Sequence, residues 1–131
     1  MDILVSGSMA YDRIMDFEGK FSDHILPDQL DNINVSFTVN SLTENFGGTA
    51  GNIANSLSLL GEKPRVLHTF GQDYHPYFEW LDQIGVPTAD IRVVEEELTA
   101  GAYITSDTQN NQITGFNPGA MKQQSGFDFD S

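Results

Sequence analysis

Residues 47–54 have the sequence Gly-Gly-Thr-Ala-Gly-Asn-Ile-Ala, in which two adjacent glycines stand directly before a helical pattern. Apolar residues recur at helical spacing over the following positions and Gly61 supplies a stop signal, so a helix is expected over about 49–60. Glycine lacks a Cβ and tolerates positive φ, and the first turn of a helix has unpaired N–H groups. Backbone donors could therefore face a ligand here, and Asn52 falls in the same turn.

The glycine pair at 47 and 48 allows two interpretations. One is a tight strand-to-helix turn without a ligand, and the other is a close approach of the backbone to a ligand. The chain contains no GxxxxGK[ST] pattern, and the glycine spacing differs from GxGxxG. Neither a Walker phosphate loop nor a dinucleotide fingerprint is therefore expected.

A carboxylate follows the first predicted strand. The apolar residues 3–5 predict a short buried strand, which leads through Ser6, Gly7 and Ser8 to Asp12. Ligands of open α/β sheets collect at the carboxyl ends of strands. An aspartate there can accept hydrogen bonds from two neighbouring hydroxyls, which suits a sugar diol. The alternative is that Asp12 caps a turn.

Two regions show the alternation of half-buried strands. Apolar and polar side chains alternate over residues 35–40 and again over 102–105. A turn signal at 110–111 separates the second region from a further apolar stretch at 113–116. These strands are expected to form a small sheet.

The segments between these strands are expected to form an α/β scaffold. Strands are predicted over 64–70 and 91–94, and between them a helix runs through Ile84 and ends at Gly85. Asp73 is expected to cap this helix, because its carboxylate can accept hydrogen bonds from first-turn N–H groups. The spacing of the helix's aromatic residues fits a core-facing side: Tyr74, Tyr77, Phe78 and Trp80.

Composition excludes several classes of function. Nineteen acidic residues against six basic ones give a formal net charge of −13, which argues against binding DNA or RNA through phosphates. The chain has no cysteine, and its three histidines are widely separated, so no metal site is expected. No apolar run approaches the roughly 20 residues of a membrane span. These features indicate a cytoplasmic α/β protein with neither nucleic acid nor membrane as a partner.

Six stretches, in order along the chain, resemble the ribokinase-like (PfkB) carbohydrate kinases, and among these the adenosine-kinase-like branch. The stretches are 3–12, 19–30, 47–54, 70–73, 85–88 and 116–121. The resemblance implies the N-terminal portion of a ribokinase-like fold, a Rossmann-like three-layer α/β/α sheet with a small β-sheet lid. Lid strands would then lie within 12–46 and 99–117, and α/β scaffold would occupy 1–11 and 47–98.

The resemblance also implies a substrate half-site. In such kinases, sugar hydroxyls are held by residues that match Asp12, Gly47, Gly48 and Asn52. The nucleoside is surrounded by residues that match Ser8, Ser36 and Phe116. The sequence departs from the pattern at Ala102, where an aromatic ring commonly stacks on the base, and at Gly101, where a larger residue is often found. Such stacking contributes about 0.5 to 1.5 kcal/mol, so the missing ring weakens the case for adenosine. Adenosine, another nucleoside and a sugar are therefore all candidate substrates, and a ribose-containing one is favoured.

These features predict the acceptor-binding and lid portion of an ATP-dependent sugar or nucleoside kinase, which transfers a phosphoryl group to a hydroxymethyl group. The family's second signature, which supplies the catalytic aspartate and an anion hole, has no match in this chain. We therefore expect no catalytic residue here, ATP and Mg²⁺ to serve only the complete enzyme, and a complementing C-terminal half as a partner. Exposed lid strands also suggest a homodimer. The alternative is a non-catalytic ligand-binding or assembly protein that retains the half-site.

Overall fold

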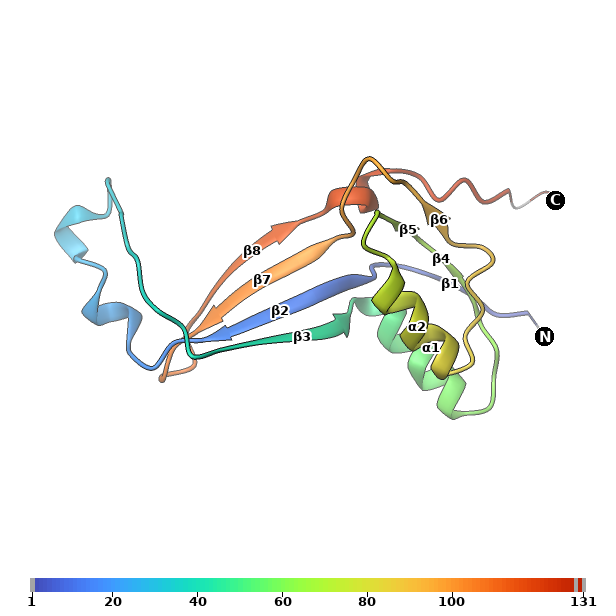
Figure 1. The fold of residues 1–131 in the computed structure, drawn as a ribbon, viewed down its shortest axis with the longest axis horizontal. Helices are drawn as coiled ribbons and strands as arrows, with labels where there is room; N and C mark the ends of the chain where they lie inside the picture. Colours follow the sequence, from blue (N-terminus) through green and yellow to red (C-terminus); the bar gives the residue numbers. More distant parts are fainter. Residues whose placement is uncertain (1, 129, 131) are drawn as a thin grey trace.

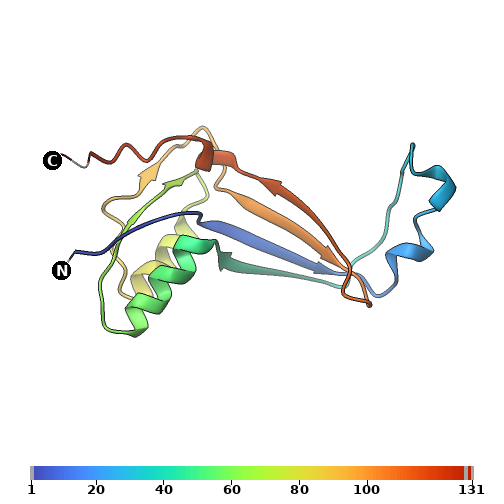
Figure 2. The same ribbon diagram turned by 180° about the vertical axis from the view of Figure 1, so that it is seen from behind.

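The computed structural model describes residues 2–128 and 130. The molecule is elongated (Figure 1). At one end, helices α1 (Thr49–Leu59) and α2 (His75–Gln83) lie side by side against short parallel strands. A four-stranded sheet reaches from there to the far end, where residues 17–40 extend beyond it as an excursion. Figure 2 shows the same arrangement from behind.

The short strands form two parallel pairs. β1 (Leu4–Ser6) pairs with β4 (Arg65–Leu67), and β5 (Thr69–Phe70) pairs with β6 (Arg92–Val93). The strand predicted over 64–70 is therefore present, but it is divided at His68. A 3-10 helix, η3 (Gly119–Lys122), packs beside β5.

The four-stranded sheet has the order β3-β2-β7-β8. β2 (Ala10–Asp16) runs antiparallel to β3 (Ser41–Gly47) and parallel to β7 (Gly101–Ser106). β7 forms the predicted hairpin with β8 (Gln112–Asn117). Its turn places Asn110 at a φ of 61°, a left-handed conformation that asparagine tolerates well.

The strand predicted over 35–40 is wrong. Regular pairing begins at Ser41, and the preceding residues lie in the excursion, which also contains the 3-10 helices η1 (Phe21–Asp23) and η2 (Pro27–Gln29). The alternating side chains do differ in burial, but an aromatic cluster causes this. Phe37 stacks on Phe17 with ring centroids 4.5 Å apart. Phe21 also packs on both rings. Phe37 is thus packed locally, without a neighbouring strand.

The main core lies between the two helices and the sheets. Its buried members come from every part of the α/β end: Val5, Met9, Tyr11, Ala50, Ala54, Val66, Phe70, Tyr77, Leu81 and Val86. The predicted helix over 49–60 is confirmed, and Gly61 and Gly85 follow α1 and α2 with φ values of 86° and 78°. Within residues 2–128 and 130, no helix has the length and apolar character that a membrane crossing requires.

The prediction that Asp73 caps α2 is wrong. Its Oδ1 instead accepts a hydrogen bond from the backbone N–H of Thr99 at 2.8 Å, and no side chain caps the helix. The carboxylate therefore joins the start of α2 to the segment that leads into β7. This long-range contact has no signal in the local sequence pattern.

Candidate substrate-binding site

A row of four residues crosses the four-stranded sheet near its α/β end. Asp12 on β2 lies opposite Asn45 on β3 and Ala102 on β7, and Ala102 lies opposite Phe116 on β8. Residues directly opposite one another point to the same face of a sheet. An amide, a carboxylate, a small side chain and an aromatic ring therefore share one face. Since Asp12 lies within a strand, the alternative that it caps a turn is wrong.

The Asp12 carboxylate lies directly against Gly47. A Cβ placed on Gly47 would collide with Asp12 Oδ2, so a side chain at this position would displace the carboxylate. Gly48 has a φ of 94°, and a Cβ there would collide with the Ser8 carbonyl oxygen. The close backbone approach expected from the glycine pair is thus present, and a carboxylate lies beside it.

Helix α1 starts at this glycine pair and is capped from another part of the chain. The Ser8 side-chain oxygen accepts a hydrogen bond from the Thr49 N–H at 2.9 Å, and the Ser8 carbonyl accepts one from the Ala50 N–H at 2.9 Å. Gly48 has no side chain to serve as a cap. Ser8 therefore fixes the helix start against the connection between β1 and β2.

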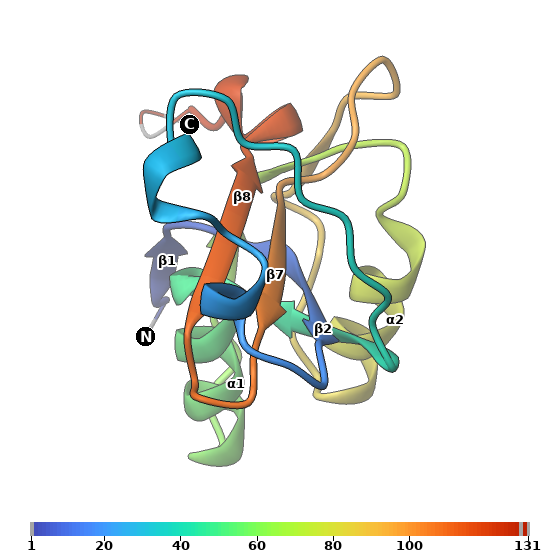
Figure 3. The same ribbon diagram turned by 90° about the vertical axis from the view of Figure 1, so that its left-hand side faces the viewer.

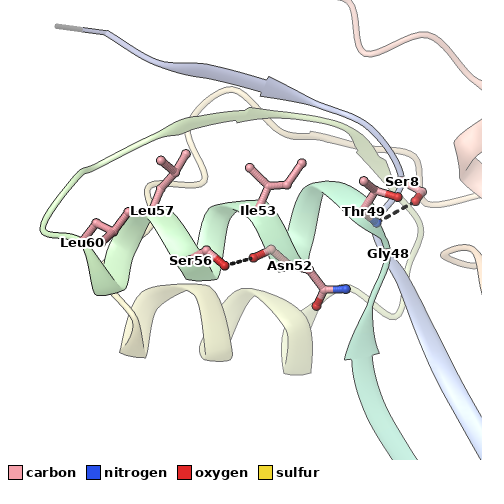
Figure 4. A pocket seen from close by; sticks show the side chains of 8 residues that line it. All are labelled: Ser8, Gly48, Thr49, Asn52, Ile53, Ser56, Leu57 and Leu60. Carbon is pink, nitrogen blue, oxygen red and sulfur yellow. Dashed lines mark hydrogen bonds between the residues drawn. The ribbon is translucent and has the colours of Figure 1, made fainter.

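An open groove of about 590 Å³ runs from this helix start along α1 (Figure 4). Polar residues, including Asn52, lie at its glycine end, and Ile53, Leu57 and Leu60 follow along the helix. The full lining is Ser8, Gly48, Thr49, Asn52, Ile53, Ser56, Leu57 and Leu60. The first turn of α1 thus presents the Asn52 amide, which suits ligand hydroxyls, whereas the N–H groups of Thr49 and Ala50 are already engaged by Ser8.

Two buried tyrosines lie beneath the glycine pair. The Tyr77 hydroxyl donates to the Gly47 carbonyl at 2.7 Å. The Tyr77 N–H donates to the Tyr11 hydroxyl at 3.3 Å, and this hydroxyl donates to the Asp73 carbonyl. Burial raises the pKa of Tyr11 to about 12. It raises the pKa of Tyr77 as well, and the negative charge of Asp12 adds to that rise. Both hydroxyls therefore stay protonated at neutral pH and act as donors.

His68 contacts the connection between β1 and β2, which contains Gly7 and Ser8. It is buried between β4 and β5, and its Nδ1 lies 3.1 Å from the Gly7 carbonyl oxygen. Burial lowers the pKa of His68, so the ring is neutral at pH 7 and its Nδ1–H can donate to that carbonyl. The scattered histidines gave no sequence signal for this role.

The structure brings most of the predicted site residues together, but it leaves one apart. Asp12, Gly47, Gly48, Ser8 and Asn52 surround the start of α1, and Phe116 belongs to the row that contains Asp12. Ser36 is exposed and lies in the excursion, beyond the far end of β3. A seven-residue strand spans roughly 20 Å, so Ser36 is remote from this group.

Three of the six basic side chains lie close to carboxylates. Arg13 pairs with Glu44 at 3.0 Å, and Arg65 pairs with Asp90 at 2.8 Å. Lys122 lies 3.8 Å from Glu97. Within the described part of the chain, no cluster of three or more histidine, aspartate or glutamate side chains could hold a metal ion. The polar groups that lie close together are those of the predicted site around Asp12.

Comparison with known proteins identifies the family. The model of the pfkB family carbohydrate kinases matches residues 2–130, so the chain belongs to this family. The nucleoside kinase of Burkholderia thailandensis, solved in complex with inosine, is 45% identical with a TM-score of 0.75 and covers 94% of this chain. This chain covers 38% of that protein. The shared architecture is the ribokinase fold.

Two archaeal proteins are also similar to this chain. The Methanocaldococcus jannaschii nucleoside kinase, described as a member of the ribokinase family, is 31% identical with a TM-score of 0.77, and the match covers 92% of this chain and 38% of that one. The nucleoside kinase of Methanothermobacter thermautotrophicus is 28% identical over 123 residues, which are 92% of this chain and 37% of the relative. The chain thus spans less than two fifths of the length of these relatives.

Proposed function

We propose that this chain binds the phosphoryl acceptor of an ATP-dependent kinase and that the acceptor is a nucleoside. The observation that carries the proposal is the Asp12 carboxylate, held against Gly47 beside the N-terminus of α1. An ionised carboxylate can accept hydrogen bonds from both hydroxyls of a ribose diol. Asn52 adds an amide within the first turn of the same helix. Family membership and the inosine bound by the Burkholderia relative support this assignment.

The contribution of these residues to phosphoryl transfer is positioning. A ribose fixed by Asp12, Gly47, Gly48 and Asn52 has its hydroxymethyl group in one orientation, and such orientation is a main source of catalysis in phosphoryl transfer. ATP supplies the phosphoryl group and Mg²⁺ neutralises its charge. Because the chain spans only 38% of the Burkholderia relative, we assign the phosphate-binding and catalytic groups to a complementing C-terminal half.

The four-stranded sheet serves as the lid over this acceptor. Its strands lie close to the 12–46 and 99–117 segments expected for the lid, although β2 begins at Ala10 and β3 ends at Gly47. We assign residues 1–9 and 48–98 to the α/β scaffold. Phe116 lies opposite Ala102, so a ring from β8 is available where β7 offers only a small side chain. We assign the base to Phe116, whose ring is half exposed. Ser36 has no part in this assignment.

The lid sheet also supports a proposal about assembly. Its outer strands are β3 and β8, and each has a neighbouring strand in the sheet on one side. Open strand edges favour pairing with another chain. We propose a homodimer through the lid, and gel filtration that shows only a monomer would contradict it.

The experiment that tests acceptor binding is calorimetry of the full-length protein with inosine and with ribose. Asp12→Asn keeps the size of the side chain but removes its charge, so the binding free energy of inosine should weaken by about 1 to 3 kcal/mol. The melting temperature should change little. Asp16→Asn is the matched control, because Asp16 points to the same face of β2 but lies at the far end of the sheet, and it should bind inosine normally. Normal binding by Asp12→Asn, or no binding of either ligand by the wild type, would overturn the proposal.

A further inference from the structure

The Tyr77 hydroxyl determines how the peptide between Gly47 and Gly48 is oriented. The carbonyl of this peptide accepts the Tyr77 hydrogen bond at 2.7 Å. A trans peptide is planar, so its N–H points away from its carbonyl oxygen. While the Gly47 carbonyl faces Tyr77, the Gly48 N–H must therefore point away from α2 and the core. Gly48 itself lines the groove.

This orientation needs to be held, because both residues of the step are glycines. Gly48 already adopts a φ of 94°, and glycine reaches several alternative conformations at little cost. A flip of the peptide would turn the carbonyl oxygen toward the groove and the N–H toward the core. Tyr77 opposes the flip from a rigid position. It is fully buried and its ring packs against Phe46, Phe70 and Trp80.

Gly51 has no role in the proposed site. The position of the Tyr77 hydroxyl explains why residue 51 is a glycine. A Cβ placed on Gly51 would collide with the Tyr77 hydroxyl oxygen, whereas the ring carbon Cζ would be 3.3 Å away. The Tyr77 hydroxyl thus occupies the space that a side chain at residue 51 would fill. The third glycine of the 47–54 stretch lets the tyrosine reach the Gly47 carbonyl.

We propose that Tyr77 is a positioning residue for acceptor binding, which it serves by aiming the Gly48 N–H at the ligand, and that Gly51 is required to admit its hydroxyl. The inference rests on the proposed function, since the ligand is the nucleoside acceptor. It assigns to α2 a part in recognition, although none of its residues lines the groove.

Binding is measured with inosine and the full-length protein. Tyr77→Phe removes only the hydroxyl, and a neutral hydrogen bond of about 1 kcal/mol corresponds to roughly fivefold in affinity. Affinity for inosine should therefore fall about three- to tenfold. Thr69→Val is the matched control, because it removes a buried hydroxyl that donates to the Gln123 carbonyl at 3.0 Å, on the other side of the sheet. Both variants should melt at a lower temperature than the wild type, because each loses a buried hydrogen bond. Thr69→Val should nevertheless bind inosine as tightly as the wild type.

A double-mutant cycle tests the role of Gly51 without any ligand. Gly51→Ala alone should lower the melting temperature, because the new methyl displaces the Tyr77 hydroxyl. Combined with Tyr77→Phe, the same alanine should cost much less, since the ring carbon at 3.3 Å is nearly accommodated. Additive losses would contradict the role given to Gly51.

The amide resonance of Gly48 separates this inference from the proposed function. In ¹⁵N-labelled protein without ligand, Tyr77→Phe should shift or broaden the Gly48 signal and Thr69→Val should not. An unchanged Gly48 signal, or unchanged inosine affinity in Tyr77→Phe, would overturn the positioning role. Absence of inosine binding in the wild type would instead overturn the proposed function, and the Gly48 signal would still decide how the peptide is oriented.

Discussion

The two ends of the four-stranded sheet are held in different ways. At the glycine end, where Ala10 pairs with Gly47, the backbone is fixed by buried groups from several elements, including Tyr77 below and Ser8 alongside. At the far end, the excursion is attached by backbone hydrogen bonds of Phe17, Gly19 and Asn40 and by the carboxylate of Asp107. This carboxylate accepts the backbone N–H of Phe21 at 3.0 Å and that of Asn111 at 2.8 Å. Figure 3, viewed from this end, shows the excursion in front of the sheet.

The difference between the two ends of the sheet indicates which end is suited to bind a ligand. Contacts at the glycine end come from both helices and from the β1–β2 connection, so a displaced backbone there would disturb several packed elements. The excursion is attached by a few backbone hydrogen bonds at its two ends, by the Asp107 carboxylate and by a small aromatic cluster of Phe17, Phe21 and Phe37. A ligand site needs preorganised donors. The glycine end meets this requirement, and the far end can move without disturbing it.

The largest expected effect concerns the glycine end. Gly48→Ala imposes a positive φ on alanine and drives its Cβ into the Ser8 carbonyl, so unfolding free energy should fall by about 3 kcal/mol. Gly61→Ala is the control, because Gly61 has a similar φ of 86° but open space around it. It should cost about 1 kcal/mol, the conformational penalty alone. Urea denaturation measures both, and equal losses would show that the clash does not matter.

A smaller effect is expected at Phe116, in the row that contains Asp12. Phe116→Leu keeps an apolar side chain but removes the ring, so inosine binding should weaken by about 0.5 to 1.5 kcal/mol. Ribose binding should be unchanged, since ribose has no base. Tyr103→Leu is the control, because Tyr103 lies on β7 one residue after Ala102 and points to the opposite face. Equal losses for inosine and ribose in calorimetry would contradict the assignment of the base to Phe116.

The smallest effect on the whole molecule is expected from Asp107, because it acts on the excursion. Burial alone would raise the pKa of this carboxyl, but its hydrogen bonds with Phe21, Asn111 and Gln109 outweigh burial and hold the pKa at about 2. An unfolded aspartate has a pKa of about 3.9. A carboxyl whose pKa is lower in the folded than in the unfolded state stabilises the folded state at pH values above its unfolded pKa. The contribution of Asp107 to this attachment should therefore be complete above about pH 4 and be lost as the pH falls toward 2.

Hydrogen exchange at the Phe21 amide measures this attachment. In the wild type, protection should fall between about pH 4 and 2, after correction for intrinsic exchange. Asp107→Asn should lower protection at neutral pH and remove most of this pH dependence, while amides of α1 stay protected. Asp28→Asn, which changes another acidic residue of the excursion, should behave as the wild type does. Loss of protection throughout α1 in Asp107→Asn would show that the two ends of the sheet are not independent.

Sequence patterns located the glycine end and the β7–β8 hairpin well and the excursion poorly. The helical spacing after Gly48 and the stop at Gly61 gave α1 nearly to the residue, because these signals act within a few positions of the chain. Alternation at 35–40 predicted a strand, but those apolar side chains pack into a local aromatic cluster and pairing begins at Ser41. The period of a pattern indicates which side chains are buried, and it does not show what buries them.

The sequence by itself determined that a helix starts after two adjacent glycines, and it left open whether the backbone approaches a ligand there. It also supplied the carboxylate of Asp12. Only the tertiary structure decided that these groups meet, that Tyr77 fixes the peptide from beneath, and that Ser36 stays apart. Such contacts join residues distant in sequence, and they depend on strand register and packing between elements, which no local pattern encodes.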